Sequence, residues 1–487
     1  MTETGKTTTT ERAIDADVAI VGGGLAGLVA ANRLTELGLT AIVLEAGDEA
    51  RYPANSRYAG GVFHIAFHDL DEAPSQLCEA IAQASAGLRD ASLADAIARD
   101  GARVARWLGR HGAQFGRGGD YPFMGNMLMP FSLRETGFKN HWRDKGGDRL
   151  LQTLESAFVA AGGRFMRGAR AIELIMTDGL CTGVRAQTPD GDRIAIRANA
   201  VILADGGFQG NAQMVREHIS PRPELLCKRG AGTGMGDGIR MAREVGAALV
   251  GMDRFYGHVQ HKAALRDEAL WPYPVLDIVA SCAIVVDANG RRFADEGLGG
   301  VAIANAIAAL DDPLSSFVVL DEEIWDTAGR TFLLPPNPAL EALGAVVYRA
   351  DSIEALATML GMNAQALAGS IDTYNRALKS DTLSSMVPPR TVRPAMLAGG
   401  ALAISGPRYL AIPLCAGLTY TMGGIVIDAD ARALDAQDRP VPGLYAAGAT
   451  TGGIEGGANS GYVGGLIKAA VFGLRAAEAA RRDFASR

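Results

Sequence analysis

The chain has 487 residues, 48% of them hydrophobic and 61 of them glycine, and a net charge of −7. This length is enough for two or three domains, and the composition is typical of a compact α/β protein rather than a disordered chain. The negative charge provides no basic surface, so we expect no binding to nucleic acid. Five scattered cysteines and seven histidines lack ligand spacing, so we expect no disulfide framework and no metal.

Residues 1–16 are polar and rich in threonine. We expect a disordered arm here, with neither a signal peptide nor a twin-arginine leader. Because no run of about eighteen apolar residues occurs, no membrane span is predicted. Together with the scattered, odd-numbered cysteines, these observations favour a cytoplasmic location.

A glycine-rich turn follows the first predicted strand. Residues 18–21 are apolar and β-branched, which predicts a buried parallel strand, and apolar residues then recur at helical spacing from Leu28 to Leu34. Glycines at three positions of the turn fit a dinucleotide fingerprint: one turns the chain, one leaves room for a pyrophosphate and one lets helix and strand pack closely. The residues assigned to the cofactor here are Gly22, Gly24, Leu25, Ala26 and Gly27.

A second strand, predicted over residues 40–44, ends in Glu45. This acid stands about 20 residues beyond the glycine turn, where a carboxylate accepts hydrogen bonds from an adenosine ribose. Residues 55–61 then form a polar, glycine-ended loop, which moves the choice of dinucleotide towards FAD. The residues assigned to the cofactor in these two segments are Glu45, Ala46, Asn55, Ser56, Arg57, Gly60 and Gly61.

Further along the chain, residues 167–197 predict a meander of short strands with a hairpin turn at 189–192. Residues 200–204 predict another buried strand, and a second glycine-rich turn at 441–448 follows near the C-terminus. A flavoprotein often uses both glycine turns, whereas a nicotinamide enzyme needs only the first. The residues assigned to the cofactor here are Ala171, Asp205, Gly206, Asp237 and Gly448.

Taken in order, these motifs resemble the flavoprotein family of fumarate reductases and succinate dehydrogenases, with its relatives tricarballylate dehydrogenase, urocanate reductase and the ketosteroid dehydrogenases. The resemblance extends from Asp17 to about Arg475. It implies an α/β fold, with a Rossmann-like FAD-binding domain of the glutathione reductase type (17–250 plus 408–487) and an inserted α+β capping domain (251–407). Within the cap we expect strands at 283–287 and 316–320 and helices at 353–360 and 364–378.

The resemblance also implies how FAD is held. Membrane-bound succinate dehydrogenases carry a His-Thr pair in the loop where this chain has Ser56-Arg57-Tyr58, so we expect the FAD to be non-covalent. The helix that starts after Gly464 would direct its N–H groups at the flavin and favour the anionic reduced ring. Ser460, Gly464 and Leu466 are assigned to the cofactor on this basis.

Three charged groups of fumarate reduction are missing from the matching positions. Tyr420 replaces a histidine, Ser460 replaces an arginine after Gly-Ala-Asn, and residues 297–300 contain no proton-delivering arginine. A dianion in a dry pocket needs such partners, so fumarate and succinate are disfavoured as substrates.

Tyrosines are the substitutes that the resemblance suggests. Tyr420 and Tyr462 fall on segments that reach the flavin in relatives, where one phenol would polarise a carbonyl and the other would take the α-proton. His258 is the leading alternative acid or base, Tyr256 lies in the same stretch, and Arg254 is a candidate carboxylate anchor.

The prediction is therefore an FAD-dependent desaturase of a CH–CH bond next to a carbonyl, for example in a ring ketone or an oxo-acid. A carboxylate dehydrogenase anchored by Arg254 and Arg57, or a fumarate reductase-like ene reductase, is the first alternative. A non-catalytic electron-relay flavoprotein is the second. The expected partners are a small molecule with an activating carbonyl and an electron acceptor that the sequence does not identify, such as oxygen, a quinone or a partner flavoprotein. No second fingerprint for NAD(P)H is present, which disfavours a nicotinamide in this role.

Overall fold

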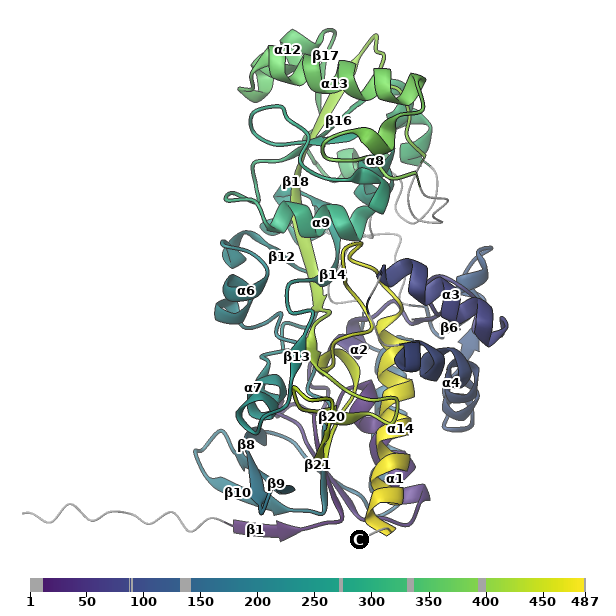
Figure 1. Cartoon of the computed structure of the whole chain (residues 1–487), viewed down its shortest axis with the longest axis vertical. Coiled ribbons are helices and arrows are strands. Elements are labelled where there is room, and N and C mark those ends of the chain that lie inside the picture. The colour runs from purple at the N-terminus through teal and green to yellow at the C-terminus, as the bar shows by residue number, and fades with distance from the viewer. Residues whose placement is uncertain are drawn as a thin grey trace, which may run out of the picture.

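The structure is a computed structural model that describes residues 12–86, 88, 91–131, 142–270, 275–330, 337–392 and 400–485. The molecule is elongated, with a lower part around helices α1 and α14 and an upper part around α12 and α13 (Figure 1). The long strand β18 (Tyr409–Thr421) runs from the upper part down to the middle of the molecule.

A six-stranded sheet forms the centre of the lower part, in the order β20-β21-β11-β2-β3-β7. Neighbouring strands from β21 to β7 pair in parallel, and β20 is antiparallel at the edge. All four residues of β2, β3 and β11 are buried, as expected for strands covered on both faces. The bounds are β2 (Val18–Val21), β3 (Ala41–Leu44), β7 (Arg164–Met166), β11 (Ala200–Leu203), β20 (Arg432–Leu434) and β21 (Pro440–Ala446).

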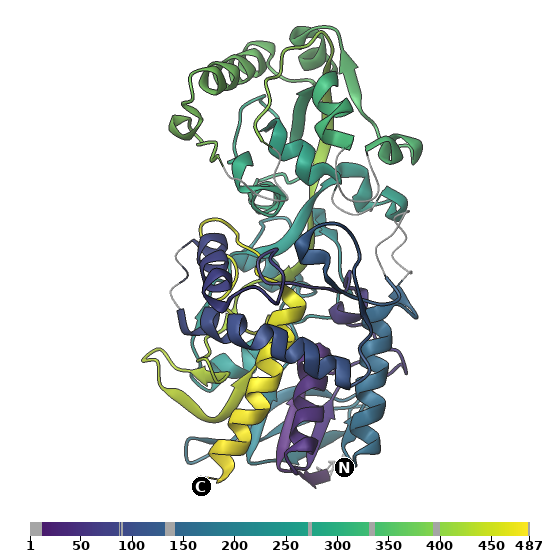
Figure 2. The same ribbon diagram turned by 90° about the vertical axis from the view of Figure 1, so that its right-hand side faces the viewer.

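Helices cover one face of this sheet. Helices α1 (Leu25–Glu36) and α14 (Gly465–Ala485) lie side by side, α5 (Gly146–Ala160) lies beside α1, and α4 (Ala91–Arg110) crosses over α14 (Figure 2). A Cβ added at Gly473 would lie 2.4 Å from the Ala26 carbonyl oxygen, so small residues permit the close contact of α1 with α14.

A four-stranded sheet, β1-β10-β9-β8, lies on the other side of the central sheet (Figure 1). It contains the predicted meander as β8 (Arg170–Thr177), β9 (Leu180–Gln187) and β10 (Arg193–Arg197). Its edge strand β1 (Arg12–Asp15) corrects the predicted disordered arm, because the backbone of these four residues pairs in parallel with β10. Residues 1–11 of that arm lie outside the described residues.

The upper part is organised around β18. Strands β12 and β16 flank it in a sheet of order β12-β18-β16-β15, and β14 and β17 pair with it as well. The strands and helices predicted for the inserted segment are confirmed as β15, β16, α12 and α13. The bounds are β12 (Cys227–Lys228), β14 (Phe255–His261), β15 (Ile284–Val286), β16 (Phe317–Asp321), β17 (Tyr348–Ala350), α12 (Ile353–Leu360) and α13 (Ala364–Lys379). The domain boundaries at 250 and 408 stay a prediction.

Shorter elements complete the chain: α2 (Asn55–Tyr58), β4 (Val62–Phe63), α3 (Pro74–Ser85), β5 (Phe115–Gly116), β6 (Asn126–Leu128), α6 (Ala212–His218), α7 (Asp237–Glu244), β13 (Leu249–Val250), α8 (Val275–Cys282), α9 (Gly300–Ala308), α10 (Glu322–Asp326), α11 (Asn337–Ala342) and β19 (Gly424–Ile425). Among the helices of the described ranges, none combines the length and apolarity that crossing a membrane requires.

Candidate functional site

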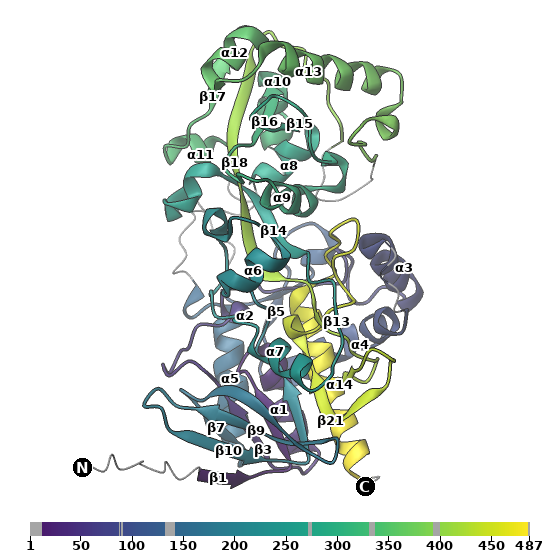
Figure 3. The ribbon, with the colours of Figure 1, turned by 60° about the vertical axis from the view of Figure 1, so that its left-hand side comes forward.

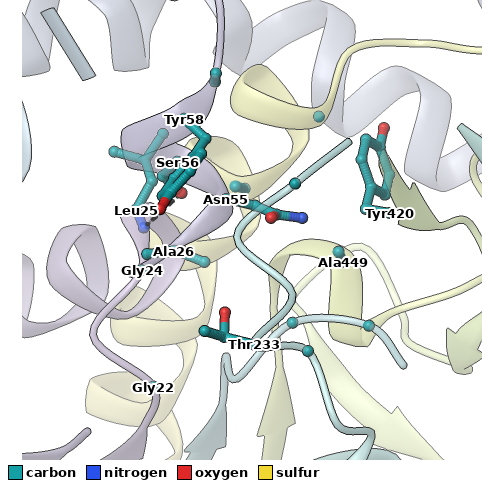
Figure 4. A pocket seen from close by; sticks show the side chains of 18 of the residues that line it. Gly22, Gly24, Leu25, Ala26, Asn55, Ser56, Tyr58, Thr233, Tyr420 and Ala449 are labelled. Atoms are coloured by element: carbon teal, nitrogen blue, oxygen red, sulfur yellow. Dashed lines mark hydrogen bonds between the residues drawn. The ribbon is translucent and has the colours of Figure 1, made fainter. Parts of the chain in front are cut away.

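A cavity of about 550 Å³ lies between the carboxyl ends of the central parallel strands and the strands β14 and β18. This edge of a parallel sheet is where ligands bind in open α/β folds. Figure 4 shows the glycine turn before α1 on one side and Tyr420 on the other. The predicted site residues that line the cavity are Gly22, Gly24, Leu25, Ala26, Glu45, Ala46, Asn55, Ser56, Gly60, Gly61, Ala171, Asp205, Gly206, Asp237, Tyr256, His258, Tyr420, Tyr462 and Leu466.

The glycines of the first turn are needed for different structural reasons. Gly22 has a φ of +103°, and a Cβ at Gly27 would lie 2.0 Å from the Gly22 carbonyl oxygen, so backbone conformation and packing require these two. Gly24 has an ordinary φ of −71°, and the nearest atom to its added Cβ is Ser56 Oγ at 3.8 Å. Gly24 therefore leaves space in the cavity that the protein itself does not fill.

Backbone and side-chain hydrogen bonds fix this turn. The two carboxylate oxygens of Glu45 accept from the N–H groups of Gly23 (2.8 Å) and Gly47 (2.7 Å), and burial raises the pKa of Glu45. The Ser56 hydroxyl accepts from the N–H of Leu25, the first residue of α1, at 3.1 Å. Hydrogen bonds within the protein therefore fix the conformation of the first turn.

Asn55 joins the lower part of the molecule to the strand β18. Its Nδ2 donates to the Thr419 carbonyl (3.0 Å) and its Oδ1 accepts from the Ala231 N–H (2.8 Å). Close by, Gln209 Oε1 and Thr419 Oγ1 are buried cavity-lining atoms that have no partner within the described ranges. Buried polar atoms are normally satisfied, so these two, with the open space at Gly24, fit a large polar ligand such as FAD.

Other predicted cofactor residues lie outside the cavity lining. Residues 55–58 form the helix α2 instead of the predicted loop, so Arg57 points away from the neighbours Asn55 and Ser56 that line the cavity. Arg57 is fully buried, pairs with Asp148 and lies over the Tyr52 ring at 4.5 Å. Arg57 is therefore wrong as a substrate anchor.

Gly448, Ser460 and Gly464, which were predicted to bind the cofactor, do not line the cavity. Gly448 packs against α1, with an added Cβ 3.2 Å from Ala26 Cβ, and its neighbour Ala449 lines the cavity instead. Ser460 and Gly464 lie behind the wall, where the Gly464 N–H donates to Glu455 Oε1 at 3.1 Å. These residues shape the wall from behind.

Tyr256 and Tyr462 form a stacked pair in the cavity wall. Their ring centroids are 3.9 Å apart with an interplanar angle of 18°. The Tyr256 hydroxyl lies 3.0 Å from His258 Nε2, and His258 Nδ1 lies 2.6 Å from Asp277 Oδ2. Because the Asp277 carboxylate holds a proton on Nδ1, Nε2 accepts from the phenol.

Asp277 is a member of this relay that the sequence analysis missed. Its Oδ1 accepts from the Val259 N–H at 2.8 Å, and an added Cβ at Gly300 would lie 2.0 Å from its Cγ, which places the carboxylate at the start of α9. A helix N-terminus favours a negative charge. Burial lowers the pKa of His258, which is therefore neutral at pH 7. The signal in the sequence was an acid inside the apolar run 275–282.

Tyr420 belongs to a second buried network. Its hydroxyl donates to Glu455, which also accepts from Lys468 Nζ (2.6 Å) and from the N–H groups of Val463 and Gly464 (both 3.1 Å). Burial raises the pKa of Tyr420 well above its usual value. Burial alone would raise the pKa of Glu455 too, but Lys468 and the N–H groups hold it below its usual range. Glu455 and Lys468 were also missed by the sequence analysis.

The sequence profile of the family described as FAD binding domain matches residues 17–466. This chain belongs to that family. It is an FAD-dependent oxidoreductase of the class that acts on CH–CH groups, and the predicted family resemblance is confirmed.

Relatives of this FAD-binding family protein include the fumarate reductase (cytochrome) of Shewanella frigidimarina, 26% identical over 90% of this chain and 72% of that protein. The NADH:acrylate oxidoreductase of Vibrio harveyi is 28% identical over 69% of this chain and 32% of that protein. Among solved structures, 3-ketosteroid-Δ4-(5α)-dehydrogenase from Rhodococcus jostii RHA1 matches with a TM-score of 0.69, 21% identity and 98% coverage of both chains. The open conformation of a flavocytochrome c3 fumarate reductase matches with a TM-score of 0.64 and 22% identity, over 98% of this chain and 79% of that chain. These structures share the fold.

The predicted carboxylate anchor of this flavoprotein does not reach the cavity. Arg254 donates to Asp253 Oδ2 (2.6 Å) and to the Gly457 carbonyl (3.3 Å) and does not line the cavity. Arg229, which the sequence analysis did not select, lines it beside His258.

Proposed function

We propose that this protein desaturates a CH–CH bond next to a carbonyl, and that the Tyr256 hydroxyl takes the α-proton. The observation that carries this proposal is the hydrogen-bonded relay from Asp277 through His258 to Tyr256, which ends at the cavity wall. A base in a flavin site has to reach the substrate and pass its proton on, and this relay can do both.

The cofactor assignment supports the same function. We assign the nucleotide end to the turn at 22–26 and to Glu45 and Ala46, and the flavin end to residues 55–61, Tyr420 and Leu466, within a Rossmann-like domain that residues 251–407 cap. The bond to FAD is non-covalent in this proposal, because the Ser56-Arg57-Tyr58 segment offers no imidazole. When bound, FAD supplies the hydride acceptor N5.

The proton follows the relay. As the α C–H bond breaks, the Tyr256 oxygen takes the proton while its own phenolic proton moves to His258 Nε2. Asp277, already bonded to Nδ1–H, stabilises the imidazolium that forms. The same steps in reverse protonate the α-carbon of an alkene, so the site also serves an ene reductase.

The two remaining tyrosines have different roles. Tyr462 stacks on Tyr256, and its hydroxyl, which accepts from the Gly465 N–H at 3.4 Å, is the carbonyl donor in this proposal. The Tyr420 proton is directed at Glu455, so Tyr420 contributes its ring to the wall and not its hydroxyl to the chemistry.

The main alternative is a carboxylate dehydrogenase or fumarate reductase-like ene reductase. The names of the relatives and the presence of Arg229 at the cavity favour it. Because the chain is an oxidoreductase, the interpretation as a non-catalytic relay is dropped. The small-molecule substrate, the unidentified electron acceptor and the cytoplasmic location remain predictions.

The test is anaerobic bleaching of the bound flavin by ring oxo-acids and 3-ketosteroids, compared with succinate and tricarballylate. We expect ring ketones or oxo-acids to bleach it and Tyr256→Phe to slow bleaching about 100-fold. Tyr348→Phe, in β17 far from the relay, is the matched control. An unchanged rate in Tyr256→Phe, or bleaching by polycarboxylates alone, would refute the proposal.

A further inference from the structure

Arg229 is placed in the cavity wall by the strands around β18. It follows β12 directly, and its N–H donates to the Leu418 carbonyl at 2.8 Å. Its side chain is only 8% exposed and lines the cavity, whereas the preceding Lys228 is exposed. The two adjacent cations therefore lie in opposite environments.

A glycine on β18 makes room for the Arg229 side chain. A Cβ at Gly417 would lie 2.5 Å from Arg229 Cδ and 2.8 Å from Gln260 Cγ. Gly417 does not have a positive φ, so the backbone itself does not require glycine there. In the sheet, Gly417 is paired with Cys227 on one side and with His258 on the other. The Arg229 side chain thus crosses β18 towards His258 (Figure 3 shows β14 beside β18).

The positive charge of Arg229 lies at the end of the cavity that Tyr256 and His258 line. Within the described ranges two arginines line the cavity, and Arg170 pairs with Asp237 at 2.8 Å on the nucleotide side. After burial, the Arg229 charge is the largest factor that lowers the pKa of His258, so it is close to the acid–base relay.

We propose that Arg229 binds one carboxylate of the substrate, so that the substrate is a monoanionic oxo-acid. Arginine keeps its charge at every working pH, and the planar fork of a guanidinium that lines a cavity matches a substrate carboxylate with two hydrogen bonds. One such arginine, with Arg57 and Arg254 directed elsewhere, suits a single carboxylate beside a neutral carbonyl. This inference rests on the proposed function and narrows its substrate class.

The test titrates two probes into the FAD-loaded enzyme and measures their binding by the change in the flavin absorbance spectrum. The probes are 4-oxocyclohexanecarboxylate and its methyl ester, which differ in the negative charge. We expect the acid to bind at least about ten-fold more tightly than the ester. In Arg229→Gln this preference is lost, and in Arg229→Lys part of it is retained, because an ammonium keeps the charge without the fork.

Lys228→Gln, which removes the neighbouring exposed charge, is the control and keeps the preference. The spectrum of each variant before titration shows whether it still holds FAD. The assignment would be overturned if the wild type bound acid and ester equally, if the acid did not bind, or if Arg229→Gln kept the preference. Loss of FAD from both Arg229 variants would also overturn it, because the residue would then belong to the cofactor site.

The two proposals fail separately. If the acid binds through Arg229 but no ring ketone bleaches the flavin, the desaturase function is wrong and the anion site stands. If ester and acid bleach the flavin equally well, the desaturase stands and the anion site is wrong.

Discussion

The Tyr420 hydroxyl lies 3.0 and 2.9 Å from the two carboxylate oxygens of Glu455, and it donates its proton to that carboxylate. Lys468, fully buried on α14, forms an ion pair with the same carboxylate at 2.6 Å and offsets its charge. A phenol held in this way is a neutral hydrogen-bond donor, and its raised pKa keeps it protonated. We therefore expect a structural role for Tyr420, in contrast to the chemical roles that the proposed function gives to Tyr256 and Tyr462.

Tyr420→Phe tests this separation. We expect a loss of about 1–2 kcal/mol in the free energy of unfolding, because one hydrogen bond to a charged group is removed. The rate of flavin bleaching should fall less than ten-fold, against about 100-fold for Tyr256→Phe. Chemical denaturation and single-turnover bleaching measure the two effects, and equal rate losses in both variants would contradict the assignment.

Lys468→Met should be more harmful to the fold. It leaves the Glu455 carboxylate buried without its cation, for which we expect a loss of about 3–5 kcal/mol in the free energy of unfolding. Adding Glu455→Gln removes the uncompensated charge and should restore part of that loss. A denaturation series of the single and double variants measures the coupling, and a Lys468→Met loss below about 1 kcal/mol would show that the pair is not coupled.

Gly24→Ala and Gly27→Ala form a matched pair within one turn. The alanine at 24 has an allowed φ and space around it, so the fold should keep its stability while FAD binding weakens at least about ten-fold. The alanine at 27 meets the Gly22 carbonyl oxygen at 2.0 Å and should destabilise the fold itself. FAD titration and thermal unfolding of the apoprotein distinguish the two, and unchanged FAD affinity in Gly24→Ala would argue against a pyrophosphate at that position.

Asp277→Asn tests the relay through its pH dependence. Dehydrogenation needs neutral His258, and burial lowers the pKa of His258, so the acid limb of the wild-type profile should lie below pH 6.5. Because Asp277 acts to raise that pKa, the variant should move the limb to still lower pH while its maximal rate falls by about 100-fold or more. The exposed Asp326→Asn is the control. A profile that stays in place would exclude His258 as the titrating group.

His64 should make the fold sensitive to acid. Burial lowers its pKa to about 4, whereas the unfolded chain binds the proton near 6.5. Protonation therefore favours the unfolded state, and stability is complete above pH 6.5 and is lost as the pH falls towards 4. We expect this group to cost about 2 kcal/mol at pH 5, a loss that His64→Asn should remove. Denaturation at pH 7 and pH 5 measures it, and equal losses in both proteins would contradict it.

Local patterns predicted the local parts of the molecule. The strand, glycine turn and helix at residues 18–36 are specified by neighbouring residues, and the same holds for β15, β16, α12 and α13. Arg57 was misjudged because the polar segment around it closes into one helical turn, which sends adjacent side chains in different directions. Its type and position in the chain gave no sign of this.

The missed site residues depend on contacts between distant segments. Glu455 accepts hydrogen bonds from Tyr420, from Lys468 and from the N–H groups of residues 463 and 464 only because the fold brings these segments together. Arg229, beside Lys228 in the sequence, looks like surface charge until the register of β12, β18 and β14 buries it. Such registers are tertiary information that periodicity and motifs do not contain.

The length of β18 has a mechanical consequence. Its 13 residues span roughly 40 Å, and strands bonded along it hold Arg229, His258 and Tyr256 in one stiff unit with Tyr420. The glycine turn for the nucleotide belongs to the other sheet. A rotation of one sheet against the other would widen or narrow the gap between these two walls while the geometry inside each wall stayed intact, and it would strain Asn55, whose side chain holds the walls together.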